Sequence, residues 1–272
     1  MAINVHNLRV YNMIVGAGSS GGEGGGGGGG GVSPLSYTTN AIFHYDIGTS
    51  SSYGGTGTTV TDLTSNGYDG TLTALGGTSY NSAGAASSLT GYRVASPSGM
   101  TQYQNQVGNS PSLTYSGWYK VAALSGLGGG FTHIFKTDTL VFRSWMYPAD
   151  ASDFNYRGKL RFQIANTGST SGTWNDFSTD FSVGDWFNIA VVANGSSGKL
   201  YINGVEEVSI TLSGTNFGSG SGAFAESANT KWYPTWNDYN YLSFGQGILY
   251  SDALSSTQIT ANFDDLKSRY GY

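Results

Sequence analysis

The sequence predicts an all-β fold, an antiparallel two-sheet sandwich that is followed by one C-terminal helix. The 272 residues include 43 Gly, 19 Tyr and 13 Phe but only 5 Pro and 11% charged residues. That composition favours sheets and tight turns over long helices. Short apolar runs recur between clusters of Gly, Ser, Asn and Thr from about residue 37 onward. A chain of this length suits one large β-domain plus an appendage.

Apolar and aromatic runs of strand length predict the individual strands. Regular short strands with turn residues between them are typical of an antiparallel sandwich. The sharpest local signal is Asn203-Gly204, because these residues supply the two positive φ angles that a type I′ hairpin needs. The predicted strands are residues 41–47, 112–121, 133–147 (a hairpin), 159–166, 185–194, 199–202, 205–211 and 241–250.

The closing helix is predicted from the segment "SSTQITANFDDLKSRYGY". Ser255 and Gln258 form a capping-box pattern at its start. Gly271 can cap its end in a left-handed conformation. One face of the helix carries apolar residues at helical spacing, so it needs a sheet to lie on. These residues are Ile259, Phe263, Leu266 and Tyr270.

The N-terminal segment, residues 1–36, is predicted to be an extended arm that precedes the sandwich domain of residues 37–272. Its first part alternates imperfectly between apolar and polar residues, and a run of glycine broken only by Glu23 follows over residues 21–31. Such an arm cannot bury its own apolar face, so we expect it to dock on another surface. The expected docking residues are Ile3, Val5, Leu8, Val10 and Ile14.

Charge and hydropathy exclude several classes of partner. The net charge is −5, and the 12 Lys and Arg residues are scattered, so no basic stripe exists to neutralise a phosphate backbone. Without cysteine the chain has no disulfide and no thiolate metal site. No stretch approaches the length of a membrane span, and the first residues lack the pattern of a signal peptide. We therefore expect no nucleic acid partner, no membrane insertion and synthesis in a cytoplasm.

Four stretches in a fixed order carry a family resemblance. They are "AIFHYDIGTSSSYGGTGTTVTDLTSNGYDGTL" (41–72), "SLTYSGWYKV" (112–121, with an inward Trp118), "DWFNIAVVANGSSGKLYINGVEEVS" (185–209) and "ILYSDALSSTQITANFDDLKSRYG" (248–271). Together they resemble the concanavalin A-like lectin/glucanase superfamily, specifically the laminin G-like (LamG) modules of tailed-phage virion proteins. The resemblance implies a jelly-roll sandwich over roughly residues 41 to 271.

Calcium is the one cofactor for which the sequence offers candidate ligands. Asp46, Asn66, Asp69 and Asp252 can supply oxygens to the ion if their loops converge, although turn formation is the commoner role for such residues. Many relatives carry an acidic pair before the final strand, where this chain has Gly245-Gln246-Gly247. That difference argues against a family-like calcium site, so no cofactor is expected.

One aromatic segment, "KWYPTWNDYNY" (231–241), has the composition of a sugar-binding loop. Aromatic faces can stack on the C–H faces of sugar rings, while short amide and carboxylate side chains bind hydroxyls. The same residues also suit packing on the sandwich or an interface with another subunit. The candidate carbohydrate-binding residues are Trp232, Tyr233, Trp236, Asn237, Asp238 and Tyr239.

Glycoside hydrolysis is not expected. Glucanases of this superfamily use carboxylates in an E-x-D-x-x-E pattern, because the reaction needs a nucleophile and a general acid. None of the glutamates here, Glu23, Glu206, Glu207 and Glu226, begins that pattern.

The resemblance implies a non-enzymatic structural protein on the surface of a bacteriophage virion, as a capsid decoration or a tail appendage anchored by its arm. The expected partners are other virion proteins, and a homo-oligomer is compatible with this role. The alternative is a glycan-binding adhesion module for carbohydrate of the host surface. The two roles can coexist.

Overall fold

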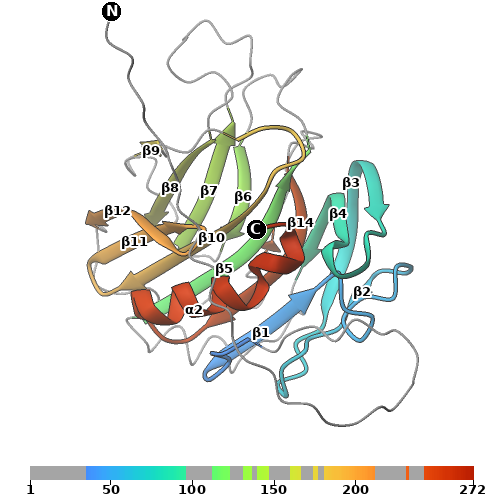
Figure 1. Cartoon of the computed structure of the whole chain (residues 1–272), viewed down its shortest axis with the longest axis horizontal. Helices are drawn as coiled ribbons and strands as arrows, with labels where there is room; N and C mark the ends of the chain where they lie inside the picture. Colours follow the sequence, from blue (N-terminus) through green and yellow to red (C-terminus); the bar gives the residue numbers. More distant parts are fainter. Residues whose placement is uncertain are drawn as a thin grey trace, which may run out of the picture. The chain divides into compact units, whose positions relative to one another are not determined.

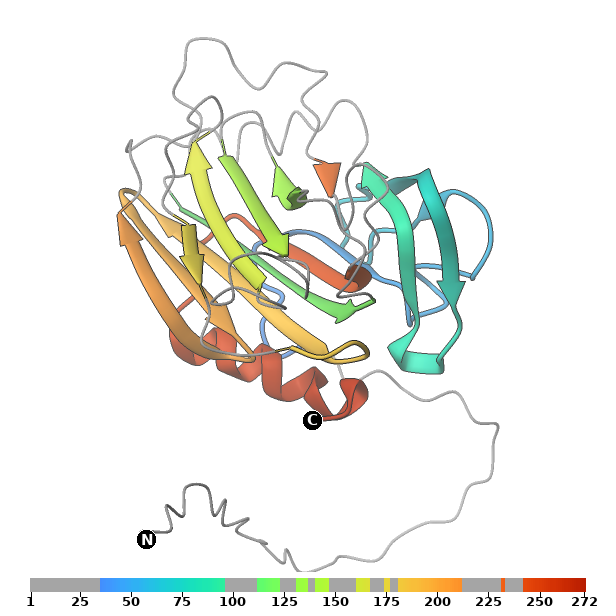
Figure 2. The same cartoon turned by 90° about the horizontal axis from the view of Figure 1, so that it is seen from above.

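The computed structural model describes residues 35–95, 112–122, 131–136, 140–146, 160–166, 174–176, 181–211, 231–232 and 242–272. All of them belong to one compact unit, Val32–Tyr272. The described strands form two antiparallel sheets, and the C-terminal helix α2 packs on the larger one (Figure 1). Figure 2 shows the smaller sheet on the side of the larger sheet away from α2. The predicted β-sandwich is therefore confirmed.

The larger sheet has the strand order β12-β11-β10-β5-β14-β4-β3-β2, with β1 paired to β14 and β13 paired to β4. Its strands are β1 (Ala41–Asp46), β2 (Thr59–Val60), β3 (Gly70–Asn81), β4 (Ser88–Ala95), β5 (Ser112–Val121), β10 (Trp186–Asn194), β11 (Ser197–Ile202), β12 (Val205–Thr211), β13 (Lys231–Trp232) and β14 (Leu242–Tyr250).

The smaller sheet has the order β6-β7-β8-β9. Its strands are β6 (Phe131–Lys136), β7 (Leu140–Met146), β8 (Leu160–Asn166) and β9 (Trp174–Asp176). The helical elements are η1 (Gly84–Ala86), α2 (Ser256–Lys267) and η2 (Ser268–Tyr270). No described helix has the length and apolar character of a membrane span.

The predicted hairpins are confirmed. β6 and β7 pair antiparallel within the run expected to be a hairpin. β11 and β12 meet at Asn203 and Gly204, whose φ angles are 50° and 78°. The sequence did not predict β3 and β4, because residues 70–95 are rich in Gly, Ser and Ala and contain few Val, Ile or aromatic residues.

β14 is the strand at which the larger sheet forks, and Gly245 makes the fork possible. On one edge β14 follows β5; on the other, residues 243–244 pair with β4 and residues 246–250 pair with β1. A bulge at Gly245 separates the two halves, so Phe244 before it and Leu249 after it both face one core. The Gly245 carbonyl accepts a hydrogen bond from the Ile47 N–H (2.9 Å), which closes the gap.

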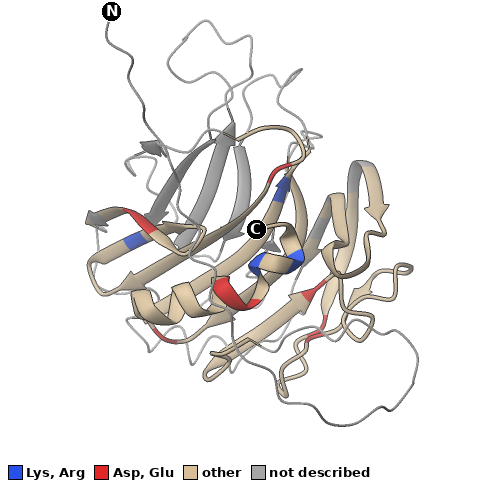
Figure 3. Cartoon of the chain, in the orientation of Figure 1, with Lys and Arg blue, Asp and Glu red and all other residues tan. Residues whose placement is uncertain are grey.

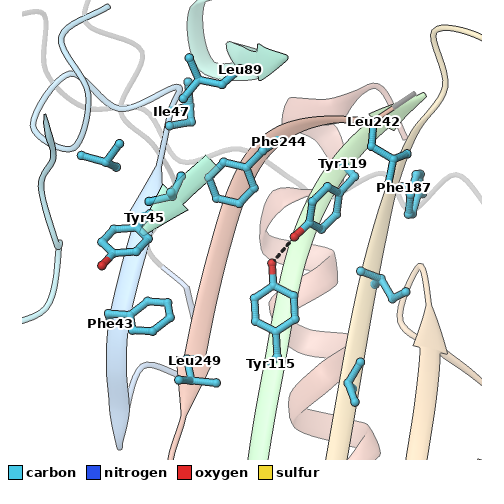
Figure 4. Close-up of a cluster of buried hydrophobic side chains, with 14 of the residues drawn as sticks. Phe43, Tyr45, Ile47, Leu89, Tyr115, Tyr119, Phe187, Leu242, Phe244 and Leu249 are labelled. Carbon is cyan, nitrogen blue, oxygen red and sulfur yellow. Dashed lines mark hydrogen bonds between the residues drawn. The ribbon is translucent and has the colours of Figure 1, made fainter. Parts of the chain in front are cut away.

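The core on the face of the larger sheet away from α2 is rich in buried aromatic rings (Figure 4). Tyr115 and Tyr119 lie four residues apart on β5, and their hydroxyls meet at 2.5 Å. Gly117 lies between them, and a Cβ there would be 2.3 Å from the Tyr115 hydroxyl. The pair can meet because the intervening residue has no side chain. Burial raises the pKa of both hydroxyls.

The other face of the larger sheet is covered by α2. The predicted capping box is present: the Ser255 hydroxyl accepts from the Gln258 N–H (3.3 Å), and the Gln258 side chain accepts from the Ser255 N–H (2.8 Å). Trp118, which is fully buried, stacks on Tyr270 with ring centroids 4.3 Å apart and on Phe263 at 5.5 Å. The inward tryptophan thus packs beneath the helix.

A buried ion pair joins β1 to the C-terminal end of the helical segment. The Arg269 guanidinium donates to both carboxylate oxygens of Asp46, one of them at 2.6 Å, and the side chains are only 7% and 2% exposed. Arg269 also donates to the carbonyl of Ala85 in η1. In Figure 3, the basic residues at the end of the helix lie near the acidic end of β1. One side chain therefore connects three segments.

Replacing Arg269 with Met is expected to lower the free energy of unfolding by about 3–5 kcal/mol, because the Asp46 carboxylate would stay buried without its partner. Urea denaturation measures the change. The control is Lys267→Met, since Lys267 pairs with Asp264 (2.7 Å) where both side chains are well exposed. This second loss is expected to be at most about 1 kcal/mol. Equal effects of the two variants would contradict the role of the buried pair.

Replacing Gly245 with Ala is expected to cost about 1–3 kcal/mol, because the new Cβ would lie 2.7 Å from the Trp186 ring. At the control position, Gly54, nothing lies within 4 Å of an added Cβ. Gly54→Ala is expected to change stability by less than about 0.5 kcal/mol. Thermal unfolding of the two variants checks this, and an unchanged Gly245→Ala protein would mean that the bulge tolerates a side chain.

Candidate ligand-binding pocket beside β1

A pocket of about 510 Å³ lies beside β1. Its walls come from the segment before β1, from β1 itself, from the turn at residues 63–66 and from the end of β14. Most of its side chains carry a hydroxyl, an amide or an imidazole. The lining residues are Thr38, Asn40, Ala41, His44, Leu63, Thr64, Ser65, Asn66, Ile248 and Ser251.

The Asp62 carboxylate organises the turn that forms one wall. One of its oxygens accepts from the N–H groups of His44 and Thr64, both at 2.9 Å. The other accepts from the Thr64 hydroxyl (2.7 Å) and the Tyr68 N–H (3.0 Å). Asp62 is buried, and these donors satisfy its charge. The carboxylate therefore fixes the turn against β1.

Asn66 completes the attachment of this turn to β1. Its side-chain amide donates to the carbonyls of Ala41 (3.1 Å) and Ile42 (2.9 Å). The Leu63 N–H donates to the His44 carbonyl (2.9 Å). Among the described strands β1 pairs only with β14, so the turn takes the hydrogen bonds that a further strand would otherwise make. These hydrogen bonds anchor the pocket wall to β1.

The opposite wall is held by Asn40, which has a φ angle of 60°. Its side-chain amide donates to the Asp252 carboxylate, and its carbonyl accepts from the Ser251 N–H (3.0 Å). Asn tolerates such a left-handed conformation better than most residues. The bonds from Asn40 tie the segment before β1 to the residues after β14.

His44 is a half-buried imidazole that lines the pocket. Burial lowers its pKa below the ordinary 6.5; the carboxylates of Asp46 and Asp62 oppose this shift, and Arg269 adds to it. Its Nε2 lies 3.0 Å from the side-chain nitrogen of Gln246. With the Gln246 amide assigned in this orientation its nitrogen donates and Nε2 accepts, which assigns the proton of the neutral ring to Nδ1.

The arrangement suits an uncharged polar ligand. Hydroxyls, amides and a neutral imidazole can each donate to or accept from a hydroxyl-bearing molecule. None of the described lining residues carries a carboxylate, so the described walls do not contain the acid pair that glycoside hydrolysis requires. These walls can form hydrogen bonds with a polar ligand.

The four candidate calcium ligands all hold parts of the chain together. Asp46 pairs with Arg269, and Asp69 accepts from the Asp62 N–H (2.9 Å). Asn66 anchors one wall of the pocket to β1, and Asp252 accepts a hydrogen bond from Asn40 in the opposite wall. Among the described residues, no three His, Asp or Glu side chains gather where they could hold a metal ion. The expectation that the protein has no cofactor stays a prediction.

The predicted aromatic site falls largely outside the described residues. The Trp232 backbone is described in β13, where it pairs with Val94 of β4. β13 and β14 share one edge of β4, so the segment between them begins and ends at that edge. Outside the described residues lie Tyr233, Trp236, Asn237, Asp238 and Tyr239, and the docking residues Ile3, Val5, Leu8, Val10 and Ile14.

The sequence did not predict His44 or Asn40 as site residues. His44 sits in a strand pattern, where a histidine is ordinarily structural. A usable signal was present in the segment "TDLTSNG" (61–67), because Asp and Asn at turn spacing often bind nearby backbone. What the pattern could not show is that this turn lies against the open edge of β1.

Similarity to solved structures concerns the fold. The binding domain of botulinum neurotoxin DC, solved with rat synaptotagmin II, is 15% identical and aligns over 84% of this chain and 52% of that one, with a TM-score of 0.53. Botulinum neurotoxin type C, whose cell entry depends on two ganglioside molecules, is 15% identical and aligns over 84% of this chain and 51% of its own, with a TM-score of 0.52. A mutant Trypanosoma rangeli sialidase with trans-sialidase activity is 12% identical and aligns over 87% of this chain and 34% of its own, with a TM-score of 0.55.

The TM-scores above 0.5 show a shared β-sandwich fold. The chain spans about half the length of the neurotoxin chains and about a third of the sialidase chain. No family model and no curated protein matches it. The β-sandwich that the family resemblance implies is thus supported, while the concanavalin A-like and LamG assignments remain predictions.

His44 is expected to titrate below 6.5 as the Nδ1–H tautomer. Since the folded pKa is lower than the unfolded one, the stability that neutral His44 contributes is complete above 6.5 and is lost as the pH falls through the folded pKa. Nitrogen-detected NMR of the ring gives the pKa and the tautomer. Between about pH 7.5 and pH 5, wild type should lose more stability than His44→Gln. An Nε2–H ring or a pKa above 6.5 would contradict this assignment.

Proposed function

We propose that this protein is a non-enzymatic glycan-binding module and that the pocket beside β1 is its binding site. The observation that carries the proposal is the chemistry of the pocket wall, where hydroxyl, amide and neutral imidazole groups surround a volume of about 510 Å³. Sugars are recognised by such neutral donors and acceptors, held in fixed positions. The segments that carry these groups are hydrogen-bonded to one another through Asp62, Asn66 and Asn40.

The fold adds support to this proposal. A botulinum neurotoxin that interacts with gangliosides and a sialidase, which are proteins that handle carbohydrate, have similar β-sandwiches. Fold similarity at such low identity does not carry function by itself. The aromatic segment 231–241 would extend glycan contacts if it binds sugar as its composition suggests.

Display on a bacteriophage virion is a second proposal, and it rests on the LamG resemblance and on the alternating arm of residues 3–15. In this proposal the arm docks on other virion proteins and the sandwich faces outward from the virion surface. Glycan binding by the sandwich would then serve attachment to the host. Deleting residues 1–18 should reduce incorporation into particles, whereas undiminished incorporation would refute the docking role of the arm.

Ser65→Arg is expected to weaken glycan binding by at least about tenfold, because Ser65 is exposed on the pocket wall and a long cationic side chain would occupy the volume. The control is Ser50→Arg, an exposed turn position after β1 that adds the same charge outside the lining residues. A glycan array identifies the ligand, and calorimetric titration compares the variants.

Three outcomes of this experiment are informative. Binding lost only in Ser65→Arg supports the pocket. An array without any bound glycan refutes the function. Binding that survives Ser65→Arg but is lost in Trp232→Ala or Trp236→Ala would move the site to the aromatic segment.

A further inference from the structure

A second pocket, of about 430 Å³, lies where β10 begins and the chain ends. Its lining differs from that of the pocket beside β1, because it combines aromatic rings with one carboxylate. Two of its residues are glycines with left-handed φ angles, Gly184 at 99° and Gly271 at 89°. The lining residues are Gly184, Asp185, Trp186, Tyr270, Gly271 and Tyr272.

Tyr272 is an exposed aromatic side chain that is nevertheless held in place. Its hydroxyl donates to the Trp186 carbonyl and accepts from the Asn203 side-chain amide (3.1 Å). Its ring contacts the rings of Trp118 and Phe263, both with centroids 5.8 Å apart. Even so, 51% of the residue is exposed. A fixed aromatic ring in solvent can stack on a ligand with little loss of conformational entropy.

Exposed apolar residues lie close in sequence to residues that form or support this pocket. Within the described residues, the exposed large hydrophobic residues are Val183 (58%), Val205 (61%) and Tyr272 (51%). Val183 belongs to the turn that supplies Asp185 to the pocket. Val205 follows the turn whose Asn203 donates to Tyr272. Of these three residues, Tyr272 is the one that lines the pocket.

Asp185 supplies the polar anchor of the pocket. One oxygen of its exposed carboxylate accepts from the Ser182 N–H (2.7 Å), which orients the side chain. A carboxylate has more acceptor positions than this one bond uses, and it binds hydroxyl groups strongly. The pocket therefore offers apolar stacking and hydroxyl binding side by side.

We propose that this C-terminal aromatic pocket binds an uncharged pyranose ring. The C–H face of the sugar would lie against the aromatic lining, and its hydroxyls would donate to Asp185. The site is separate from the pocket beside β1 and does not depend on it. Because the lining offers the exposed ring of Tyr272 and the half-buried ring of Trp186 beside one carboxylate, a single sugar ring is the ligand that its size and polarity match.

The test is an NMR titration of the full chain with the methyl glycosides of glucose, galactose, mannose and N-acetylglucosamine. The expected result is a saturable shift of the Trp186 indole N–H and of the Tyr272 amide with at least one of them. Asp185→Asn keeps the acceptor for Ser182 but loses the charge, and should weaken binding about tenfold. Tyr272→Ala should abolish it, whereas Tyr272→Phe should retain the stacking and most of the affinity.

Ser65→Arg serves as the matched control, since it alters only the pocket beside β1 and should leave these shifts unchanged. Loss of the shifts in Ser65→Arg would overturn the assignment to the C-terminal pocket. So would the absence of saturable shifts with all four glycosides, or equal affinity in Tyr272→Ala with an unchanged melting temperature. Shifts that grow with protein concentration, without sugar, would instead show that this surface binds a second copy of the chain, and would overturn the proposal.

Discussion

The ion pair between Asp46 and Arg269 is the contact on which the described structure depends most. It joins residues that lie 223 positions apart, and it sits where β1 leaves the sheet and the helical segment ends. Arg269 also reaches the Ala85 carbonyl, and Gly48 must be glycine there, because a Cβ would lie 1.9 Å from that oxygen. Two buried charges are costly to desolvate, so the main contribution of this pair is to specify one arrangement of β1, η1 and the helical segment.

The position of β1 in turn determines the pocket beside it. His44 lies two residues from Asp46 on β1, and the turn organised by Asp62 follows the outer edge of the same strand. If β1 shifted, the donors and acceptors of the pocket would separate. Side chains that are held before a ligand arrives lose little entropy on binding, which is the physical reason to expect useful affinity from an open polar pocket. The ion pair and the candidate site are thus parts of one arrangement.

Local features were predictable from the sequence, and features that depend on the tertiary fold were not. The Ser255 cap and the Asn203 turn need only neighbouring residues, so pattern and turn chemistry located them. β3 and β4 were missed because their Gly- and Ser-rich residues pair only in the context of the sheet. Neither could the sequence show that Arg269 meets Asp46, since partners so far apart have no local signature. The candidate pocket could not be predicted for the same reason, because its walls come from three separate stretches of the chain.

A double-mutant cycle on the ion pair tests this account most directly. Asp46→Asn, Arg269→Gln and the combined variant are unfolded in urea at neutral pH, and their free energies are compared with that of wild type. Each single change leaves one charge buried alone, so the account predicts that the combined variant is more stable than the sum of the two losses implies, by about 2 kcal/mol or more. Additive losses, equal within about 0.5 kcal/mol, would show that the two side chains act independently and would contradict the account.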